Sequence, residues 1–149
     1  MLEDIVETTT AHGNGDRLKW DLYNIPHHCS YLALSDEKGE KVTVPEPLVE
    51  ELLLHGKESA YIVSSSNPIQ DTEEGRGQEQ PPHVQAKNCY VDYLRRVDGM
   101  KFLVTMEEPN TKIPEVIIFE IDDHGMKIGG LAPLAVTQNI TRNPAPRAG

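Results

Sequence analysis

Residues 88–106 read NCYVDYLRRVDGMKFLVTM, and this stretch carries the strongest fold signal in the chain. In both halves apolar side chains alternate with polar ones, which is the period of a β-strand with one buried face. Between the halves stands Asp98-Gly99, a pair typical of two-residue hairpin turns. The stretch therefore predicts two antiparallel strands, at residues 88–97 and 100–106.

Strand-like runs recur on both sides of this predicted hairpin. They lie at residues 17–25, 30–35, 41–44, 59–65, 116–119 and 126–136. The run Val116–Phe119 is apolar at every position, which indicates a central strand covered on both faces. Because short turn sequences join several of these runs, the pattern predicts an antiparallel meander.

One short helix is predicted at Pro47–His55. Its apolar side chains, Leu48, Val49, Leu52 and Leu53, fall at helical spacing on one face. Proline is tolerated in the first turn of a helix, and Gly56 follows the last turn as a C-terminal glycine would. Residues 2–10 are expected to form one or two further helical turns.

These elements predict a single α+β domain over residues 1–149, with a mainly antiparallel sheet of about five to seven strands and one short helix packed on it. A small barrel or sandwich is the alternative. The predicted core consists of Leu32, Leu34, Leu48, Leu52, Leu53, Ile62, Val91, Tyr93, Phe102, Val104, Ile117, Ile118 and Phe119.

Two segments, the polar loop 64–85 and the extended C-terminal tail 137–149, are poor in apolar side chains and rich in proline. Ordering a backbone costs about 1–2 kcal/mol per residue, which such segments cannot offset by burying their own side chains. We therefore expect both to be docking arms that bind other protein subunits, in a homo- or hetero-oligomer.

The chain of 149 residues has a net charge of −10, which opposes binding to nucleic acid and to an anionic membrane surface. It holds no apolar run of transmembrane length. The acidic start MLEDIVETTT is unlike a secretory signal peptide, so a cytoplasmic or virion location is expected. In that setting Cys29 and Cys89 are expected to be reduced, partly buried thiols.

Two clusters contain residue types that could carry chemistry. His27-His28-Cys29 could provide a thiolate nucleophile or metal ligands, but neighbouring residues of a strand point to opposite faces. Asp122-Asp123-His124 has the residue types of a metal site, yet it stands where a turn is expected. We therefore expect no catalytic residue, no cofactor and no metal.

Other short motifs lack the context that their chemistry needs. The run Ser64–Ser66 has no nucleophile elbow around it, and Gly75-Arg76-Gly77 lacks the ending of a phosphate loop. Arg95-Arg96 is the basic pair of the predicted meander, and Gly129-Gly130 indicates a bulge or bend. The acidic residues of the loop, which could mimic DNA phosphates, are Asp71, Glu73, Glu74 and Glu79.

The absence of recognisable chemistry favours a non-enzymatic structural subunit of a larger assembly. A phage virion component, such as a head decoration or tail-completion protein, is the class that we have in mind. One alternative is an acidic inhibitor or adaptor that binds a single partner. The other is a small enzyme whose site the sequence does not show.

Overall fold

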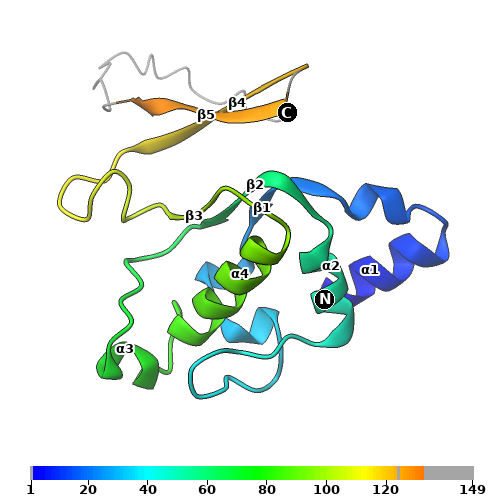
Figure 1. Ribbon diagram of the computed structural model, residues 1–149. Helices are drawn as coiled ribbons and strands as arrows, with labels where there is room; N and C mark the ends of the chain where they lie inside the picture. The colour runs from blue at the N-terminus through cyan, green and yellow to red at the C-terminus, as the bar shows by residue number, and fades with distance from the viewer. Residues whose placement is uncertain (1, 124, 133–149) are drawn as a thin grey trace, which may run out of the picture.

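The computed structural model describes residues 2–123 and 125–132, which form four α-helices, three short 3₁₀ turns and five strands (Figure 1). The helices are α1 (Leu2–Ala11), α2 (Pro47–Leu54), α3 (Glu73–Gly77) and α4 (Val84–Arg96). The 3₁₀ turns are η1 (Gly15–Leu18), η2 (Pro26–His28) and η3 (Tyr31–Ala33). The strands are β1 (Trp20–Asn24), β2 (Gly56–Ser64), β3 (Lys101–Val104), β4 (Val116–Asp122) and β5 (Gly125–Ala132).

The antiparallel meander predicted from the sequence is wrong. Strands β1, β2 and β3 form a parallel sheet in the order β1-β2-β3, and β4 and β5 form a separate antiparallel pair. Neighbouring parallel strands require a crossover connection, which is usually a helix. Here α2 lies between β1 and β2 in the chain, and α4 lies between β2 and β3.

The largest correction concerns α4, which contains most of the strand predicted at residues 88–97. Its buried side chains recur at helical spacing and are Val84, Gln85, Ala86, Cys89, Tyr90, Tyr93 and Leu94. Asp98-Gly99 ends this helix instead of turning a hairpin, because the Gly99 N–H donates to the Leu94 carbonyl at 2.8 Å. Side-chain volume is also restricted there: a Cβ on Gly99 would lie 2.1 Å from Leu94 Cδ1.

The strands predicted at residues 30–35 and 41–44 are also absent. Residues 31–33 form η3, and residues 34–46 run as an irregular segment to the start of α2. This segment is tied to α4, since the Thr43 N–H donates to the Gln85 carbonyl at 3.1 Å. The apolar side chains of the predicted strand at 41–44, Val42 and Val44, are exposed, whereas Thr43 is buried, so their alternation reflects neither strand pairing nor core packing.

The parallel sheet is covered on both faces, by different elements. Ala60 and Ile62 of β2 belong to the main core, which they share with the buried side chains of α2 and α4. The alternate residues Tyr61 and Val63 pack in a smaller core with the inner face of the β4–β5 hairpin. Figure 1 shows this layering, with the helices on one side of the sheet and the hairpin on the other.

Most of the predicted core is confirmed. The buried members are Leu34, Leu52, Leu53, Ile62, Tyr93 and Val104, and the partly buried members are Leu48, Val91, Phe102, Ile117 and Phe119. Two members are wrong: Leu32 is 63% exposed and Ile118 is 40% exposed. Leu32 lies in η3, and Ile118 points away from the sheet that the hairpin covers. The run Val116–Phe119 is consequently not a central strand.

The loop 64–85 has anchors within its own domain that its composition did not reveal. Ile69 is buried, its N–H donates to Glu107 Oε1 at 2.7 Å, and its carbonyl accepts from Lys87 Nζ at 2.9 Å. The expectation that this segment could not pack on its own chain is wrong. Its role as a docking arm stays a prediction, and the tail 137–149 lies outside the described residues.

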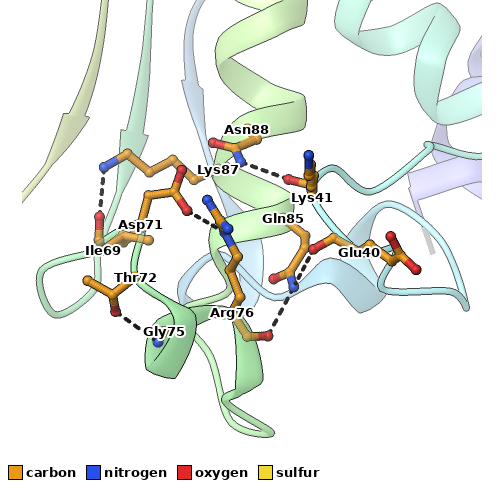
Figure 2. A network of polar contacts seen from close by, with 10 residues as sticks. All are labelled: Glu40, Lys41, Ile69, Asp71, Thr72, Gly75, Arg76, Gln85, Lys87 and Asn88. Carbon is orange, nitrogen blue, oxygen red and sulfur yellow. Dashed lines mark hydrogen bonds and ion pairs between the residues drawn. The ribbon is translucent and has the colours of Figure 1, made fainter.

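Polar contacts with α4 hold the middle of this loop (Figure 2). The buried Gln85 amide donates to the carbonyls of Arg76 at 3.0 Å and Glu40 at 3.3 Å, which ties two segments to one helix. The Thr72 hydroxyl caps α3 by accepting from the Gly75 N–H at 3.1 Å. Hydrogen bonds from one buried amide therefore help to hold a loop that has few apolar side chains to bury.

Candidate functional site

The carboxyl ends of the three parallel strands lie along one edge of the sheet. The register pairs Asn24 with Val63 and Ser64 with Val104, so all three strands stop at the same level. In open parallel sheets this edge is the usual place for a ligand. The segments that follow the strands contain His27-His28-Cys29 and the serine run, which the sequence places far apart.

The turn after β1 has an unusual backbone. His27, His28 and Cys29 have φ values of 51°, 55° and 66°, in the left-handed region that residues other than glycine seldom adopt. Two hydrogen bonds hold the turn: the His83 N–H donates to the Cys29 carbonyl at 3.0 Å, and His28 Nδ1 bonds to the Ser65 carbonyl. The two imidazoles are exposed and the thiol is fully buried.

Both cysteines are free, as predicted, and they are more completely buried than expected. Burial raises the pKa of the Cys29 thiol to about 12 and that of the Cys89 thiol to about 12. A thiol reacts as its thiolate, so neither side chain is poised as a nucleophile at neutral pH. The prediction that His28 and Cys29 do not converge agrees with this arrangement.

His83 has a structural position beside Cys29. Its Nδ1 accepts from the Tyr31 N–H at 3.4 Å, which leaves Nε2 to donate to the Glu79 carbonyl at 3.2 Å. This arrangement suits the neutral ring, and burial lowers the pKa of His83 below its usual range. Its contacts thereby link the turn after β1 to the loop before α4.

A cavity of about 440 Å³ lies at this edge of the sheet. It is lined by His28, Ser65, Ser66, Asn67, Pro81, Pro82, Thr105 and Met106. The Ser66 hydroxyl lies 2.8 Å from the Ser64 hydroxyl, so its described partner is another serine and not an imidazole. The lining offers neutral hydrogen-bonding groups and no arranged nucleophile and base.

A larger groove of about 690 Å³ lies on the helix side, beside the start of α1 and of α2. We call it the α1–α2 groove. Its apolar lining residues are Leu2, Leu32, Ala33, Leu34, Val49 and Pro81. This volume falls within the range of small-molecule pockets, about 300–1,000 Å³, and it also suits the anchoring side chains of a peptide.

Among the described residues that line the α1–α2 groove, the acidic side chains outnumber the basic ones. Its lining includes the carboxylates of Glu3, Asp36 and Glu46 and no lysine or arginine. The Ser35 hydroxyl donates to Glu46 Oε1 at 3.4 Å, and all three carboxylates belong to exposed residues. An apolar surface bordered by carboxylates can hold an apolar group that carries or adjoins a cation.

The other motifs from the sequence occupy structural positions. Arg96 pairs with Asp92 at 2.9 Å and lies over the Tyr93 ring at 4.3 Å from its centre. Arg76, between the two glycines of α3, pairs with Asp71 at 2.6 Å. These contacts account for the positions of Arg96 and Arg76 without a phosphate ligand.

The acidic turn of the hairpin gives no metal site among the described residues. Asp122 lies 3.8 Å from Lys127 Nζ across the β4–β5 pair, whereas His124 lies outside the residues described. Within residues 2–123 and 125–132 no group of at least three His, Cys, Asp or Glu side chains could hold a metal ion. In the same ranges no helix is long and apolar enough to cross a membrane.

The α1–α2 groove is the feature that the sequence did not indicate. Its walls come from the first residues of the chain, the segment after β1, the start of α2 and the loop before α4. The one local sign was Leu32, an apolar residue that we placed in the core. Comparison with protein-family models, curated proteins and solved structures finds no match to this chain.

Proposed function

We propose that this chain is a non-enzymatic subunit of a protein assembly, and that it binds its neighbours through exposed apolar surface. The α1–α2 groove carries the proposal, because it combines about 690 Å³ of volume with an apolar lining and a carboxylate border. Apolar surface bordered by polar groups is typical of sites where proteins bind one another.

The outer face of the β4–β5 hairpin supports the same proposal. Val116 and Ile118 on this face are exposed, and Ile121 near the tip is 78% exposed. Lone surface leucines and isoleucines are ordinary, but several on one small hairpin favour a binding role. The hairpin would then present a second contact surface on the opposite side of the molecule from the groove.

A shell or tube, such as a phage head or tail, is the kind of assembly that we propose. Two contact surfaces on opposite sides of one subunit allow each copy to touch two others, and head-to-tail contacts of this kind build rings and filaments. Docking arms at loop 64–85 and residues 137–149 would further suit such an assembly, because an arm covers a large surface with few residues.

An adaptor or inhibitor that binds a single partner is the second candidate. The net charge of −10 favours it, since an acidic surface attracts a basic partner at long range. It differs from the first candidate in stoichiometry, because an adaptor is expected to be monomeric without its partner.

Light scattering of the purified chain over a wide range of concentrations tests the proposal. We expect a mass that rises above the monomer value of 16.6 kDa with concentration. As a companion measurement, loop 64–85 should be cut less readily by protease in the associated state. A monomeric mass at every concentration would contradict the assembly proposal and favour the adaptor.

A further inference from the structure

We infer that the α1–α2 groove of one copy binds residues 133–149 of a neighbouring copy. The inference rests on the proposed function and names the partner of the groove: an apolar, cationic segment of the same protein.

The apolar lining matches the composition of that segment. The groove presents Leu2, Leu32 and Val49, and Leu32 is largely exposed in the chain by itself. Residues 133–149 read PLAVTQNITRNPAPRAG and offer Leu134, Val136 and Ile140 as apolar anchors. Covering Leu32 with such side chains removes apolar surface from water, which is the main driving force for association.

The charges of the two surfaces are complementary. The segment contains two arginines, Arg142 and Arg147, and no aspartate or glutamate, although the whole chain has a net charge of −10. The groove presents the carboxylates of Glu3, Asp36 and Glu46 without a lysine or arginine among its lining residues. Guanidinium groups pair with carboxylates in a planar, directional geometry, so the arginines are well suited to this border.

The layering of the fold favours a neighbour over the same copy. The segment follows β5, and the β4–β5 hairpin covers the face of the parallel sheet opposite to the helices. The groove is built from α1, α2 and the turns after β1, which lie on the helix side (Figure 1). To reach its own groove the segment would have to pass around the sheet, whereas the groove of a second copy imposes no such path.

Photo-cross-linking of the full-length chain tests the inference. A photoreactive amino acid replaces Leu134, and copies with heavy and light isotopes are mixed in equal amounts before irradiation. We expect cross-links between heavy and light copies, located by mass spectrometry at residues of the α1–α2 groove. Cross-links confined within single copies would overturn the choice of a neighbour, and heavy–light cross-links that map elsewhere would overturn the choice of the groove.

A leucine pair provides the matched variants. Leu32→Asp places a charge in the groove and is expected to raise the dissociation constant of self-association about tenfold or more, as for a central interface anchor. Leu54→Asp alters another exposed leucine, at the end of α2 and outside the groove lining, and should leave the constant nearly unchanged. Circular dichroism checks that both variants fold, and equal effects of the two variants would contradict the inference.

Charge reversal on both sides provides an independent arm. Asp36→Lys with Glu46→Lys should weaken self-association, and adding Arg142→Glu with Arg147→Glu to the same chain should restore most of it. Glu58→Lys with Glu51→Lys, at exposed positions outside the groove lining, is the control. Absence of restoration overturns the arginine–carboxylate pairing.

The outcomes separate the inference from the proposed function. If the wild-type chain associates but the groove variants have no effect, the inference fails and the assembly proposal stands. If the wild-type chain is monomeric at every concentration, both fail.

Discussion

Two strands of this protein have similar sequences and different surroundings. Residues 60–63 of β2 read AYIV and residues 116–119 of β4 read VIIF, so both are apolar at every position. All four residues of the β2 run are buried, with Ile62 fully inaccessible, whereas Val116 and Ile118 of β4 are exposed. An apolar run therefore predicts a strand, but it does not predict that both of its faces are covered.

The difference follows from the position of each strand. β2 is the middle strand of the parallel sheet, with helices on one face and the hairpin on the other. Within the part of the chain that the structure describes, β4 pairs with one strand, β5, and has one covered face. Alternate side chains of β4 are consequently left at the surface, where they are available to a partner.

The largest expected effect comes from placing a carboxylate in each strand. Ile62→Asp should abolish folding, because an unpaired buried charge costs several kcal/mol before it neutralises. Ile118→Asp should be milder, by about 1 kcal/mol or less, since the new carboxylate reaches water. Chemical denaturation with circular dichroism measures both, and comparable losses of stability would show that the outer face of the hairpin is buried in solution.

The inner face of the hairpin should give an intermediate effect. Phe119 meets Tyr61 edge to face, with ring centres 5.6 Å apart, and packs in the smaller core. Phe119→Ala should cost about 2–4 kcal/mol, at or below the usual range for a buried phenylalanine because the side chain is only partly buried.

Hydrogen exchange measures which strands lose stability in Phe119→Ala. In Phe119→Ala the amides of β4 and β5 should lose protection before those of β2, if the hairpin opens separately from the body. Ile118→Ala, one residue away on the outer face, is the control and should leave protection almost unchanged. Simultaneous loss in β2 and β4 would indicate one cooperative unit.

A smaller loss of stability is expected when the side-chain amide of Gln85, which hydrogen-bonds to loop 64–85, is removed. Gln85→Ala removes donors to the carbonyls of Glu40 and Arg76 and should cost about 1–3 kcal/mol, the penalty for buried groups that lose a partner. Gln80→Ala, at an exposed position of the same loop, is the control. Protease cleavage within loop 64–85 should be faster in the first variant alone, and equal cleavage of both would argue against the anchoring role of Gln85.

The smallest expected effect is on the pH dependence of the free energy of unfolding, through the buried His83. Burial lowers the pKa of His83 in the folded chain, so near its ordinary value of 6.5 the unfolded chain binds more protons. This contribution to stability is therefore complete above pH 6.5 and is lost as the pH falls through the lower folded value. The free energy of unfolding, measured from neutral to mildly acidic pH, should decrease with falling pH more steeply in the wild type than in His83→Gln.

The control for that measurement is Gln80→Ala, an exposed substitution that removes no titratable group and should keep the acid dependence of the wild type. If His83→Gln and the wild type have the same slope, His83 does not contribute to the acid response.

Much of the local structure was predictable from the sequence. The helix at Pro47–Leu54 has its proline and its apolar face where they were predicted. Gly56, predicted to end this helix, is instead the first residue of β2 and lacks a positive φ, and a Cβ there would lie 2.7 Å from the Trp20 ring. The strands that became β1 and β3 were also predicted, because their apolar side chains alternate with polar ones, and those that became β2 and β4 were predicted from short apolar runs. The last predicted strand, at 126–136, overlaps β5. These features depend on neighbours in the sequence, and local rules describe them well.

The helix α4 shows where the same rules fail. Cys89, Val91 and Tyr93 fit one face of a strand, which leaves Tyr90 and Leu94 on the opposite, polar face. A helix instead puts Ala86, Tyr90 and Leu94 on the same buried face as Cys89 and Tyr93. Asp98-Gly99 strengthened the error because the pair suits a hairpin turn and the end of a helix equally. Exchanging this strand for a helix changed the sheet from antiparallel to parallel and altered the whole topology.

By itself the sequence determined the apolar runs, the helix after Pro47, the buried thiols and the acidic charge, because these depend on residue type and short-range spacing. The tertiary structure decided the direction of the strands, the open face of the hairpin, the anchoring of loop 64–85 on Gln85 and the α1–α2 groove. Each of these requires residues distant in the chain to meet, and a side chain's exposure depends on which elements cover it.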